Sequence, residues 1–411
     1  MMELRVTVQI DGADVYAGKL FQNVRNGSET TTFSYDPAYL ENPHAFAFAP
    51  DMPLVAGPFH SEGLTGFRAF EDCMPDRWGR NLMLRAERNT AKSESRAAKT
   101  LFETNMLAGV SDETRQGAIR IWTPDGTAAL APEESGVPRE VSIPELLSAA
   151  DAFSTDVTAD IRDLLAAGSS LGGARPKASV RSERGELLIA KFPKVDEGAL
   201  EDVGAWEHVC LQLMERCGID VPDSRLMRVG GRSVLLLRRF DREGARRIPY
   251  ISGVTAIQGE DGGHYSYLDL VEFLEDSGAS PEADIRQLWL RALFSCAVGN
   301  TDNHMRNHGF LRETGGWRLS PAFDVNPTPG TEPKYLNTAV DFENRSADPE
   351  LAVSMSEYYR LSRVEARHQA RQMVRELASW RRLAVADGIA RQSIELMEGC
   401  FESGIERLRN V

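Results

Sequence analysis

A short predicted hairpin brings two polar segments of this 411-residue chain back to the same place. Residues 310–312 and 317–319 each have the composition of a strand, and a glycine-containing turn joins them. A hairpin returns the chain to its start, so Asn307 just before it and Asp324 just after it are expected to lie close together. A carboxylate and an amide oxygen suit a hard divalent cation such as magnesium. The hairpin therefore favours folds in which these side chains share one ion, although a polar loop and a turn-forming aspartate are simpler alternatives.

The order of predicted elements favours an α+β protein of two or three domains at roughly 150 residues per domain. Capping boxes at Ser142 and Ser362 predict helices that run to about residue 153 and about residue 384. Alternation and turn residues predict the following early strands: 4–10, 15–20, 31–35 and 117–122. The expected domains are 1–130 as an N-terminal α+β subdomain, 140–245 as a mixed core and 246–411 as a helical lobe.

Composition excludes several classes of protein. The chain carries 47 Lys and Arg against 61 Asp and Glu, a formal net charge of −14. Such a chain repels phosphate backbones, which disfavours nucleic-acid binding by bulk charge but leaves room for a local basic patch. No apolar run approaches the ~20 residues of a membrane span, and Glu3 and Arg5 interrupt any leader-like start. Five cysteines without a C-x-x-C pair indicate reduced thiols. We expect a soluble, cytoplasmic protein.

Three features in the middle of the chain could bind phosphate. Residues 169–177 contain two adjacent glycines and Lys177, which could let backbone N–H groups approach a phosphate, although a hairpin turn or a helix C-cap explains them as well. Lys191 lies on a predicted strand and could pair with nucleotide phosphates. Glu207, on the next predicted helix, could hold Lys191 in place. A solvated lysine and a surface glutamate are the simpler readings.

The order of these features along the chain predicts an ATP-dependent kinase. Asp302 and Asn307 have the D-x-x-x-x-N spacing of a kinase catalytic loop. Asp302 would accept the proton of the substrate hydroxyl, and Asn307 would bind magnesium together with Asp324. Each feature is weak alone, but glycine loop, strand lysine, helix glutamate, catalytic aspartate and metal aspartate follow one another as in phosphotransferases.

Five motifs, in order along nearly the whole chain, resemble the HipA family of serine/threonine kinase toxins from bacterial type II toxin–antitoxin pairs. The segment 33–40 also resembles the N-terminal subdomain of that family. The motifs are Ser170-x-Gly172-Gly173-Ala174-x-Pro176-Lys177, the Lys191 strand, Arg239-Phe240-Asp241-Arg242, Gly299-Asn300-Thr301-Asp302-x-His304 with Asn307, and Pro321-x-x-Asp324-Val325.

The resemblance implies a two-lobed, protein-kinase-like α+β fold that uses ATP and Mg²⁺. It implies Asp302 as the general base and Asn307 and Asp324 as metal ligands. Ser170, with Ser169 as its neighbour, falls where the family autophosphorylates. Many members have Glu at the hinge position of Arg238. The resemblance assigns the nucleotide to Gly172, Gly173, Ala174, Arg175, Pro176, Lys177, Lys191, Arg238, Arg239, Phe240, Asp241, His304, Asn307 and Phe323.

The resemblance also implies partners. A HipB-like helix-turn-helix antitoxin would bind the chain, and DNA would be reached only through that antitoxin. The substrate would be a translation component such as an aminoacyl-tRNA synthetase, often the glutamyl one. A small-molecule kinase on the same fold, or an inactive nucleotide-binding partner of the antitoxin, are the alternative interpretations.

Overall fold

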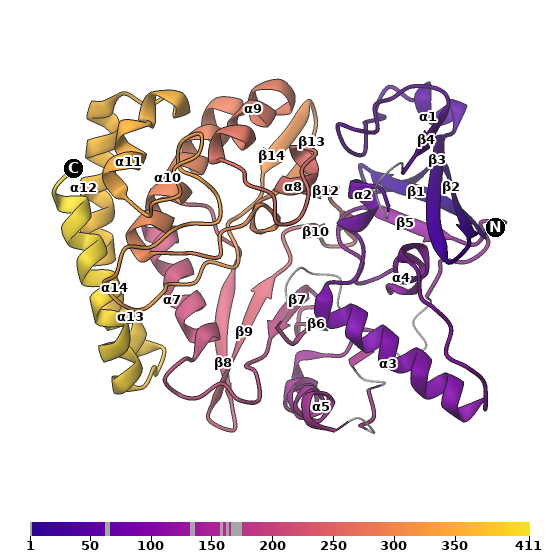
Figure 1. Cartoon of the computed structure of the whole chain (residues 1–411), viewed down its shortest axis with the longest axis horizontal. Helices are drawn as coiled ribbons and strands as arrows, with labels where there is room; N and C mark the ends of the chain where they lie inside the picture. The colour runs from indigo at the N-terminus through magenta and orange to yellow at the C-terminus, as the bar shows by residue number, and fades with distance from the viewer. Residues whose placement is uncertain (1, 62–65, 132–135, 157–158, 162–163, 166–174) are drawn as a thin grey trace. The chain divides into compact units, whose positions relative to one another are not determined.

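The computed structural model describes residues 2–61, 66–131, 136–156, 159–161, 164–165 and 175–411 (Figure 1). Its residues form two compact units, each built from two stretches of chain. The first unit is Met1–Phe192 with Asp241–Ile251, and the second is Pro193–Phe240 with Ser252–Val411. This division differs from the three expected domains, because residues 140–192 join the N-terminal part and a short stretch after residue 240 returns to it.

An antiparallel sheet forms the centre of the first unit (Figure 1). The predicted early strands are confirmed within it. Apolar side chains that alternate along the strands, such as Val6, Val8 and Phe33, are fully buried. In sheet order the strands are β4 (Pro58–His60), β3 (Ser28–Tyr35), β2 (Ala13–Arg25), β1 (Met2–Ile10) and β5 (Ile119–Trp122).

Helices and two hairpins complete the first unit. The helices are α1 (Pro37–Leu40), α2 (Arg68–Glu71), α3 (Arg77–Ser93), α4 (Glu103–Gly109) and α5 (Ile143–Thr155). The hairpins pair β6 (Lys177–Arg181) with β7 (Leu187–Lys191) and β10 (Arg242–Glu243) with β11 (Arg246–Arg247). The capping box expected at Ser142 is wrong, because the 3₁₀ turn η1 (Glu140–Ser142) leads into α5 and the Ser142 side chain caps nothing.

The second unit begins with a helix and a hairpin and continues with further helices (Figure 1). α7 (Val203–Arg216) precedes an antiparallel hairpin of β8 (Ser224–Val229) and β9 (Arg232–Arg238). β12 (Tyr250–Ser252) lies where the chain re-enters this unit. The remaining elements are α8 (Gly253–Ala256), α9 (Tyr267–Ser277), α10 (Pro281–Val298), η2 (Met305–Asn307), β13 (Gly309–Glu313), β14 (Gly316–Leu319), α11 (Pro349–Ser354), η3 (Ser356–Tyr359), α12 (Arg363–Leu377), α13 (Trp380–Ala386) and α14 (Arg391–Arg409).

One continuous helix from residue 362 to about residue 384 was expected, and this is wrong. The capping box at its start is present, with Ser362 and Glu365 bonded reciprocally. The helix nevertheless ends at Leu377, and α13 begins at Trp380. The break lets Trp380 turn inward and stack on Phe401, with ring centroids 4.7 Å apart.

Helix α10 forms the buried axis of the second unit. It is apolar on nearly every side, and α14 packs closely against it. Gly404 of α14 permits this approach, because a Cβ atom there would lie 1.9 Å from the carbonyl oxygen of Ala297. In the described part of the chain no helix combines the length and apolar character that a membrane span requires.

Candidate active site

The loop between α10 and β13 carries Asp302, His304 and Asn307. Asn307 Nδ2 donates a hydrogen bond of 2.6 Å to the backbone oxygen of Asp302, which fixes the loop on itself. The Asp302 side chain is 75% exposed, with Oδ1 4.0 Å from His304 Nε2. Asn337 Nδ2 also donates to Asp302 Oδ1 at 3.4 Å. The carboxylate is therefore held at the surface, where a substrate hydroxyl can reach it.

The predicted hairpin that follows this loop is confirmed. β13 and β14 are antiparallel, and Phe310 lies opposite Leu319. The chain that leaves β14 therefore returns toward Asn307. This is the course that the sequence predicted for the segment that carries Asp324.

Asp324 has an unusual backbone conformation. Its φ is 59°, in the left-handed region that few residues other than glycine adopt. Its N–H donates a 3.0 Å hydrogen bond to Oε1 of Glu207 on α7, a side chain that is only 2% exposed. Residues held in such conformations concentrate at functional sites. The predicted pairing of Glu207 with Lys191 stays a prediction, whereas the contact of Glu207 with Asp324 was not expected from the sequence.

A small pocket joins the two segments. Asn307 lines it together with Phe323 and Val325, the neighbours of Asp324, so the loop and the segment after the hairpin meet there. Phe323 also packs on Phe240, with ring centroids 5.6 Å apart. The other lining residues come from these two segments and from α7, α9 and α10: Met214, Tyr267, Arg291, Ser295, Asn300, Asn303, His308 and Ala322.

Two polar residues that line this pocket, His308 and Arg291, were not singled out from the sequence. His308 is 5% exposed, and burial together with the charge of Arg291 lowers its pKa to about 3. Among the described residues neither ring nitrogen of His308 has a hydrogen-bond partner. Arg291 is also buried and donates to the carbonyl of Ser320. No spacing pattern could have revealed this pair, because α10 and the loop bring them together only in the fold.

Two lysines lie side by side in the first unit. Lys177 on β6 and Lys191 on β7 are directly opposite in the antiparallel register, so their side chains leave the same face. Like charges placed in this way repel unless an anion lies between or beside them. Lys177 has such an anion, because Asp76 Oδ2 lies 3.1 Å from its Nζ and both side chains are at most 5% exposed. Asp76 is also the N-cap of α3, with Oδ1 accepting a hydrogen bond from the N–H of Gly79 at 2.7 Å.

The predicted hinge residues have different environments. Arg238 is exposed and pairs with Asp223 at 2.9 Å, while Arg239 is 2% exposed. Asp241 is 2% exposed, and its Oδ2 accepts hydrogen bonds of 2.8 Å from the N–H of Gly117 and from Arg242. The nucleotide contact that the resemblance implies for Asp241 stays a prediction.

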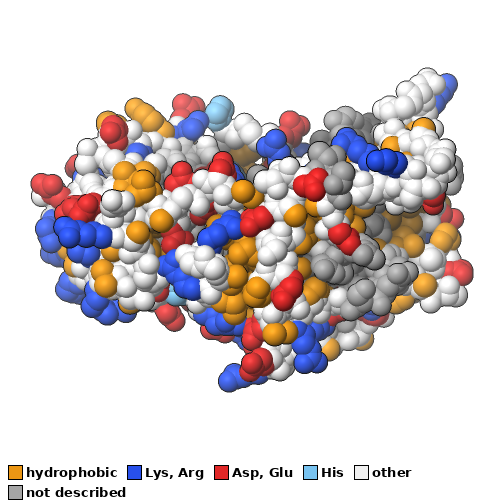
Figure 2. Space-filling view, turned by 90° about the horizontal axis from the view of Figure 1, so that it is seen from below, with side chains coloured by type: hydrophobic (Ala, Val, Ile, Leu, Met, Phe, Trp, Pro, Cys, Tyr) orange, Lys and Arg blue, Asp and Glu red, His pale blue; other side chains and the backbone are white. Residues whose placement is uncertain are grey.

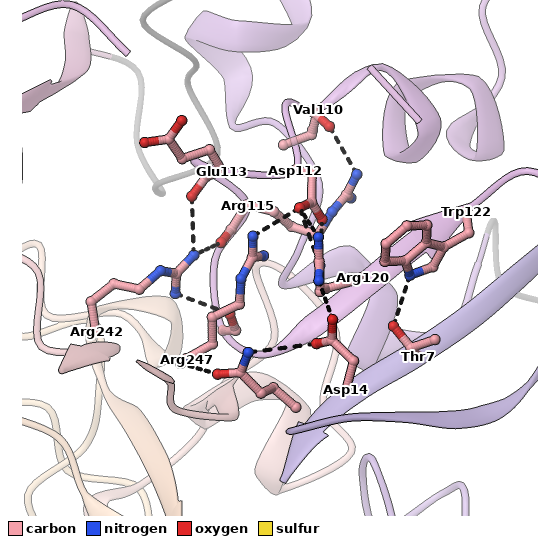
Figure 3. Close-up of polar contacts among 12 residues, drawn as sticks. Thr7, Asp14, Val110, Asp112, Glu113, Arg115, Arg120, Trp122, Arg242 and Arg247 are labelled. Carbon is pink, nitrogen blue, oxygen red and sulfur yellow. Dashed lines mark hydrogen bonds and ion pairs between the residues drawn. The ribbon is translucent and has the colours of Figure 1, made fainter. Parts of the chain in front are cut away.

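An arginine network surrounds the stretch after the hinge (Figure 3). Arg242 donates hydrogen bonds to the backbone carbonyls of Glu113, Arg115 and Gly117. The bond to the carbonyl of Gly117 is 3.0 Å long. Asp112 accepts hydrogen bonds of 2.7 Å from Arg120 and 2.9 Å from Arg247. Burial raises the pKa of Asp112, but the hydrogen bond from Arg120 and the charge of Arg247 outweigh it and hold that pKa below its ordinary value. The network binds the β10–β11 hairpin to the rest of the first unit.

Part of the predicted nucleotide site lies outside the described residues, namely Ser169, Ser170, Gly172, Gly173 and Ala174. Their roles stay predictions. The described end of this stretch continues the hairpin, because the carbonyl of Pro176 accepts a 2.9 Å hydrogen bond from the N–H of Phe192. Arg175, just before it, is partly exposed.

The donor set at the pocket fits magnesium. The described residues contain no group of three or more His, Cys, Asp and Glu side chains that would form a metal site of the protein alone. Asn307 uses its Nδ2 as a donor to the loop, so its Oδ1 is the atom that can face a cation. One amide oxygen and the carboxylate of Asp324 suffice for Mg²⁺ when phosphate oxygens and water supply the other ligands.

The fold is that of a known two-lobed α+β class, which confirms the predicted protein-kinase-like fold. A chain of the Shewanella oneidensis MR-1 toxin–antitoxin complex of HipA, HipB and operator DNA superposes with a TM-score of 0.65 at 16% identity, covering 99% of each chain. Residues 169–382 match the model of the HipA-like C-terminal domain, and residues 8–104 match that of the HipA N-terminal domain. The chain belongs to the HipA family.

Two similar proteins are named as putative kinases. One, from Haemophilus influenzae (strain ATCC 51907 / DSM 11121 / KW20 / Rd), is 24% identical over 190 residues, which are 39% of this chain and 54% of that protein. The other, from Sinorhizobium fredii (strain NBRC 101917 / NGR234), is 24% identical over 340 residues, or 74% of each chain. The match thus spans about half the length of the first relative and three quarters of the second.

Proposed function

We propose that this chain is an ATP- and magnesium-dependent serine/threonine protein kinase that acts as a toxin. The observation that carries the proposal is the meeting of Asn307 and the neighbours of Asp324 at one pocket, beside the exposed carboxylate of Asp302. The kinase names of the two relatives and membership of the HipA family support it.

The described side chains suggest a division of roles. Asp302 accepts the proton of the attacking hydroxyl, and Asn337 orients the carboxylate through its hydrogen bond. Asn307 and Asp324 hold Mg²⁺, which when bound neutralises charge on the phosphates. Glu207 keeps Asp324 in its left-handed conformation by accepting from its N–H. Glu207 is therefore a positioning residue.

The lysine pair in the first unit supplies positive charge for phosphate. Asp76 already compensates Lys177. Lys191, its neighbour across the strands and less buried, is therefore the better candidate for the phosphate contact. The glycine loop before Lys177 would complete this site, with Ser170 or Ser169 as the position of autophosphorylation. A phosphate there adds about two negative charges, which would disfavour a second anion in the same loop.

The partners are proposed on the family alone. The structural relative from Shewanella is in a complex with HipB and operator DNA, and we extend a HipB-like antitoxin to this chain. A translation component such as an aminoacyl-tRNA synthetase, with the glutamyl enzyme as first candidate, is the proposed substrate.

A phosphorylation assay tests the proposal. Purified chain is incubated with labelled ATP, with and without Mg²⁺, and with glutamyl-tRNA synthetase or a generic protein substrate. We expect transfer that requires Mg²⁺ and falls by at least about 100-fold in Asp302→Asn, since a general base contributes roughly 10²–10⁴-fold. Asp261→Asn, an exposed aspartate that pairs with Arg306 on the same loop, is the matched control.

Three outcomes would count against the proposal. Transfer that Asp302→Asn leaves intact removes the assigned base. Absence of any transfer with bound nucleotide indicates an inactive nucleotide-binding partner, and transfer only to small molecules indicates a small-molecule kinase. Mass spectrometry after incubation with ATP examines Ser169 and Ser170, and absence of phosphate at both removes autophosphorylation.

A further inference from the structure

Three aromatic side chains of the second unit are more than half exposed. Tyr335 is 63% exposed, Phe342 65% and Tyr358 54%, and all other aromatic side chains in the described ranges are more buried. Burial of one aromatic side chain removes about 150–250 Å² from water, so these three forgo a large stabilisation. Single exposed apolar residues are ordinary, but three aromatic ones within one stretch of chain indicate a surface that another molecule covers.

Tyr335 lies close to the carboxylate of Asp302. Exposure alternates along residues 335–338, so Tyr335 and Asn337 face outward while the residues between and after them are buried. Two residues of chain span at most about 7 Å, and Asn337 Nδ2 donates a 3.4 Å hydrogen bond to Oδ1 of Asp302. The Tyr335 ring is therefore within reach of a molecule whose hydroxyl lies at Asp302.

A buried side chain fixes this segment against the loop that carries Asp302. Oδ1 of Asn303 accepts hydrogen bonds of 2.8 Å from the N–H of Asn337 and 3.2 Å from that of Thr338. Asn303 is 1% exposed, and its Nδ2 donates to the hydroxyl of Tyr267 at 3.0 Å. A surface held in this way before binding loses little conformational entropy when a partner arrives.

Phe342 and Tyr358 form the second part of the surface. Phe342 lies in the turn that Val340 closes by donating a 3.0 Å backbone hydrogen bond to Asn344, and Tyr358 lies in η3. Their ring centroids are 5.4 Å apart, and the rings are nearly perpendicular at 89°. Each ring supports the other, yet both stay more than half exposed, so the pair offers a preformed apolar contact. Phe342 follows Asn337 by five positions, which limits the distance between their Cα atoms to about 18 Å.

Acidic side chains accompany the aromatic ones. Glu343 follows Phe342, Glu357 precedes Tyr358, and both are exposed. In the described part of the chain Glu343 forms no ion pair, and Glu357 has a contact of 3.8 Å with Arg363, whose side chain is 63% exposed. Exposed pairs of this kind compensate little charge. Charge is uneven over the chain, as the Lys and Arg side chains gathered at the left end of the face in Figure 2 show, so a local acidic rim can select its partners.

We propose that Tyr335, Phe342 and Tyr358, which we call the aromatic surface, bind the polypeptide substrate on both sides of the hydroxyl that is phosphorylated. The rings contact apolar side chains of the substrate, and Glu343 and Glu357 favour basic residues beside them. Nucleic acid and anionic lipid are disfavoured as partners, because the same carboxylates repel phosphate.

The inference rests on the proposed function, because it gives Asp302 the role of receiving the substrate hydroxyl. It adds a selection among substrates, since a small molecule at Asp302 would leave the aromatic surface uncovered. One extended substrate residue spans about 3.3 Å. The distances along the chain therefore predict an apolar side chain about two residues from the phosphorylated serine or threonine on one side, and another up to about five residues away on the other side.

The test measures the binding of synthetic peptides to the full chain. The probe is a fluorescein-labelled peptide of about 13 residues with a central serine, leucine two positions to one side, phenylalanine five positions to the other, and lysine and glycine elsewhere. A second probe has the reverse order. Two reference peptides replace the leucine and phenylalanine with glycine, or the lysines with glutamate. Fluorescence anisotropy without ATP should show at least about tenfold tighter binding of one probe than of either reference.

Substitutions assign this preference to the aromatic surface. Tyr335→Ala and Phe342→Ala should each weaken binding of the probe at least about tenfold. Leu396→Ala, which truncates an exposed apolar side chain on α14, is the matched control and should not change it. Circular dichroism verifies that each variant retains its helices.

A second pair of variants examines the charge. Changing Glu343 and Glu357 together to Gln should weaken binding of the probe about three- to tenfold at low salt. The same change at Glu395 and Glu406, which are exposed on α14, alters the net charge equally and should have little effect.

A transfer assay separates this inference from the proposed function. With ATP and Mg²⁺, Tyr335→Ala and Phe342→Ala should raise KM for the peptide at least about tenfold and leave KM for ATP unchanged. A general structural defect would not divide the two constants in this way. Selective binding of the probe without any phosphotransfer would contradict the proposed function while supporting the aromatic surface as a binding site.

Three results would overturn the inference. The first is absence of binding, or equal binding of all four peptides, by the unchanged chain. The second is a loss of binding in Leu396→Ala as large as in Tyr335→Ala and Phe342→Ala. The third is tighter binding of the glutamate peptide than of either probe, which would reverse the assigned charge of the partner.

Discussion

The buried ion pair between Asp76 and Lys177 allows a sharp test of how the first unit is held together. Their charged atoms are 3.1 Å apart, and the side chains are 2% and 5% exposed. Asp76→Asn removes the negative charge but keeps a side chain that caps helices well, so the start of α3 is preserved. The change leaves the Lys177 ammonium buried without this partner. Breaking a buried pair in this way costs about 3–5 kcal/mol.

Lys177→Met is expected to cost less. Burial already raises the pKa of Asp76, with the charge of Lys177 opposing it. Without Lys177 that pKa rises further, so the carboxyl can take up a proton and avoid a buried charge. A carboxyl whose pKa is higher in the folded than in the unfolded state stabilises at low pH and loses this contribution as pH rises through the folded pKa. The Lys177→Met protein should therefore lose stability relative to the unchanged chain between acid and neutral pH.

Hydrogen exchange of the amides in α3 measures the effect within the first unit, independently of the second. A loss of 3 kcal/mol corresponds to a roughly 100-fold decrease in protection, at 1.4 kcal/mol per factor of ten. The double variant removes both charges and should be at least about 2 kcal/mol more stable than the sum of the single changes predicts. Asp36→Asn, at the exposed cap of α1, is the matched control and should change stability by less than about 0.5 kcal/mol. The reasoning would be refuted if the stability losses of the two single variants added up to the loss in the double variant. It would also be refuted if Asp76→Asn left the protection of α3 unchanged.

Two further predictions concern the second unit. Gly404→Ala should lower the free energy of unfolding by about 1–3 kcal/mol, because its methyl group would overlap the backbone of Ala297; urea unfolding measures this, and a neutral effect would contradict the close approach of the helices. For Gly399→Ala on the same helix, the nearest atom is a side-chain methyl at 3.0 Å and backbone atoms lie at 3.8 Å or beyond, so this change should cost much less. Burial raises the pKa of Tyr267 to about 12, so folding should lose stability as pH rises from about 10 to 12. Tyr267→Phe should flatten that part of the alkaline denaturation curve, whereas Tyr358→Phe at an exposed site should leave it unchanged.

Local signals in the sequence were sufficient for many elements. In α10, Pro281 at the first turn and the left-handed Gly299 after the last turn are signals of this kind, because each residue has a backbone preference that acts without tertiary contacts. The same holds for the β13–β14 hairpin, and with it the return of the chain from Asn307 toward Asp324.

Features decided by distant contacts were missed. The break between α12 and α13 depends on the burial of Trp380 against Phe401, which no pattern within the helix encodes. The Ser142 signal failed because a 3₁₀ turn begins the helix instead. In the site, the bond from Asp324 to Glu207 joins positions 117 residues apart in sequence. Such pairings follow from the fold and not from spacing.

The stretch Asp241–Ile251 lies in the first unit although the chain on both sides of it belongs to the second. The polypeptide therefore passes from one unit to the other three times, after residues 192, 240 and 251. A fragment that stops at residue 192 would lack Arg242 and Arg247 and would leave Asp112 with fewer donors. Expressing the N-terminal unit by simple truncation should thus give an unstable product, and a single proteolytic cut at one passage would leave two covalent connections intact.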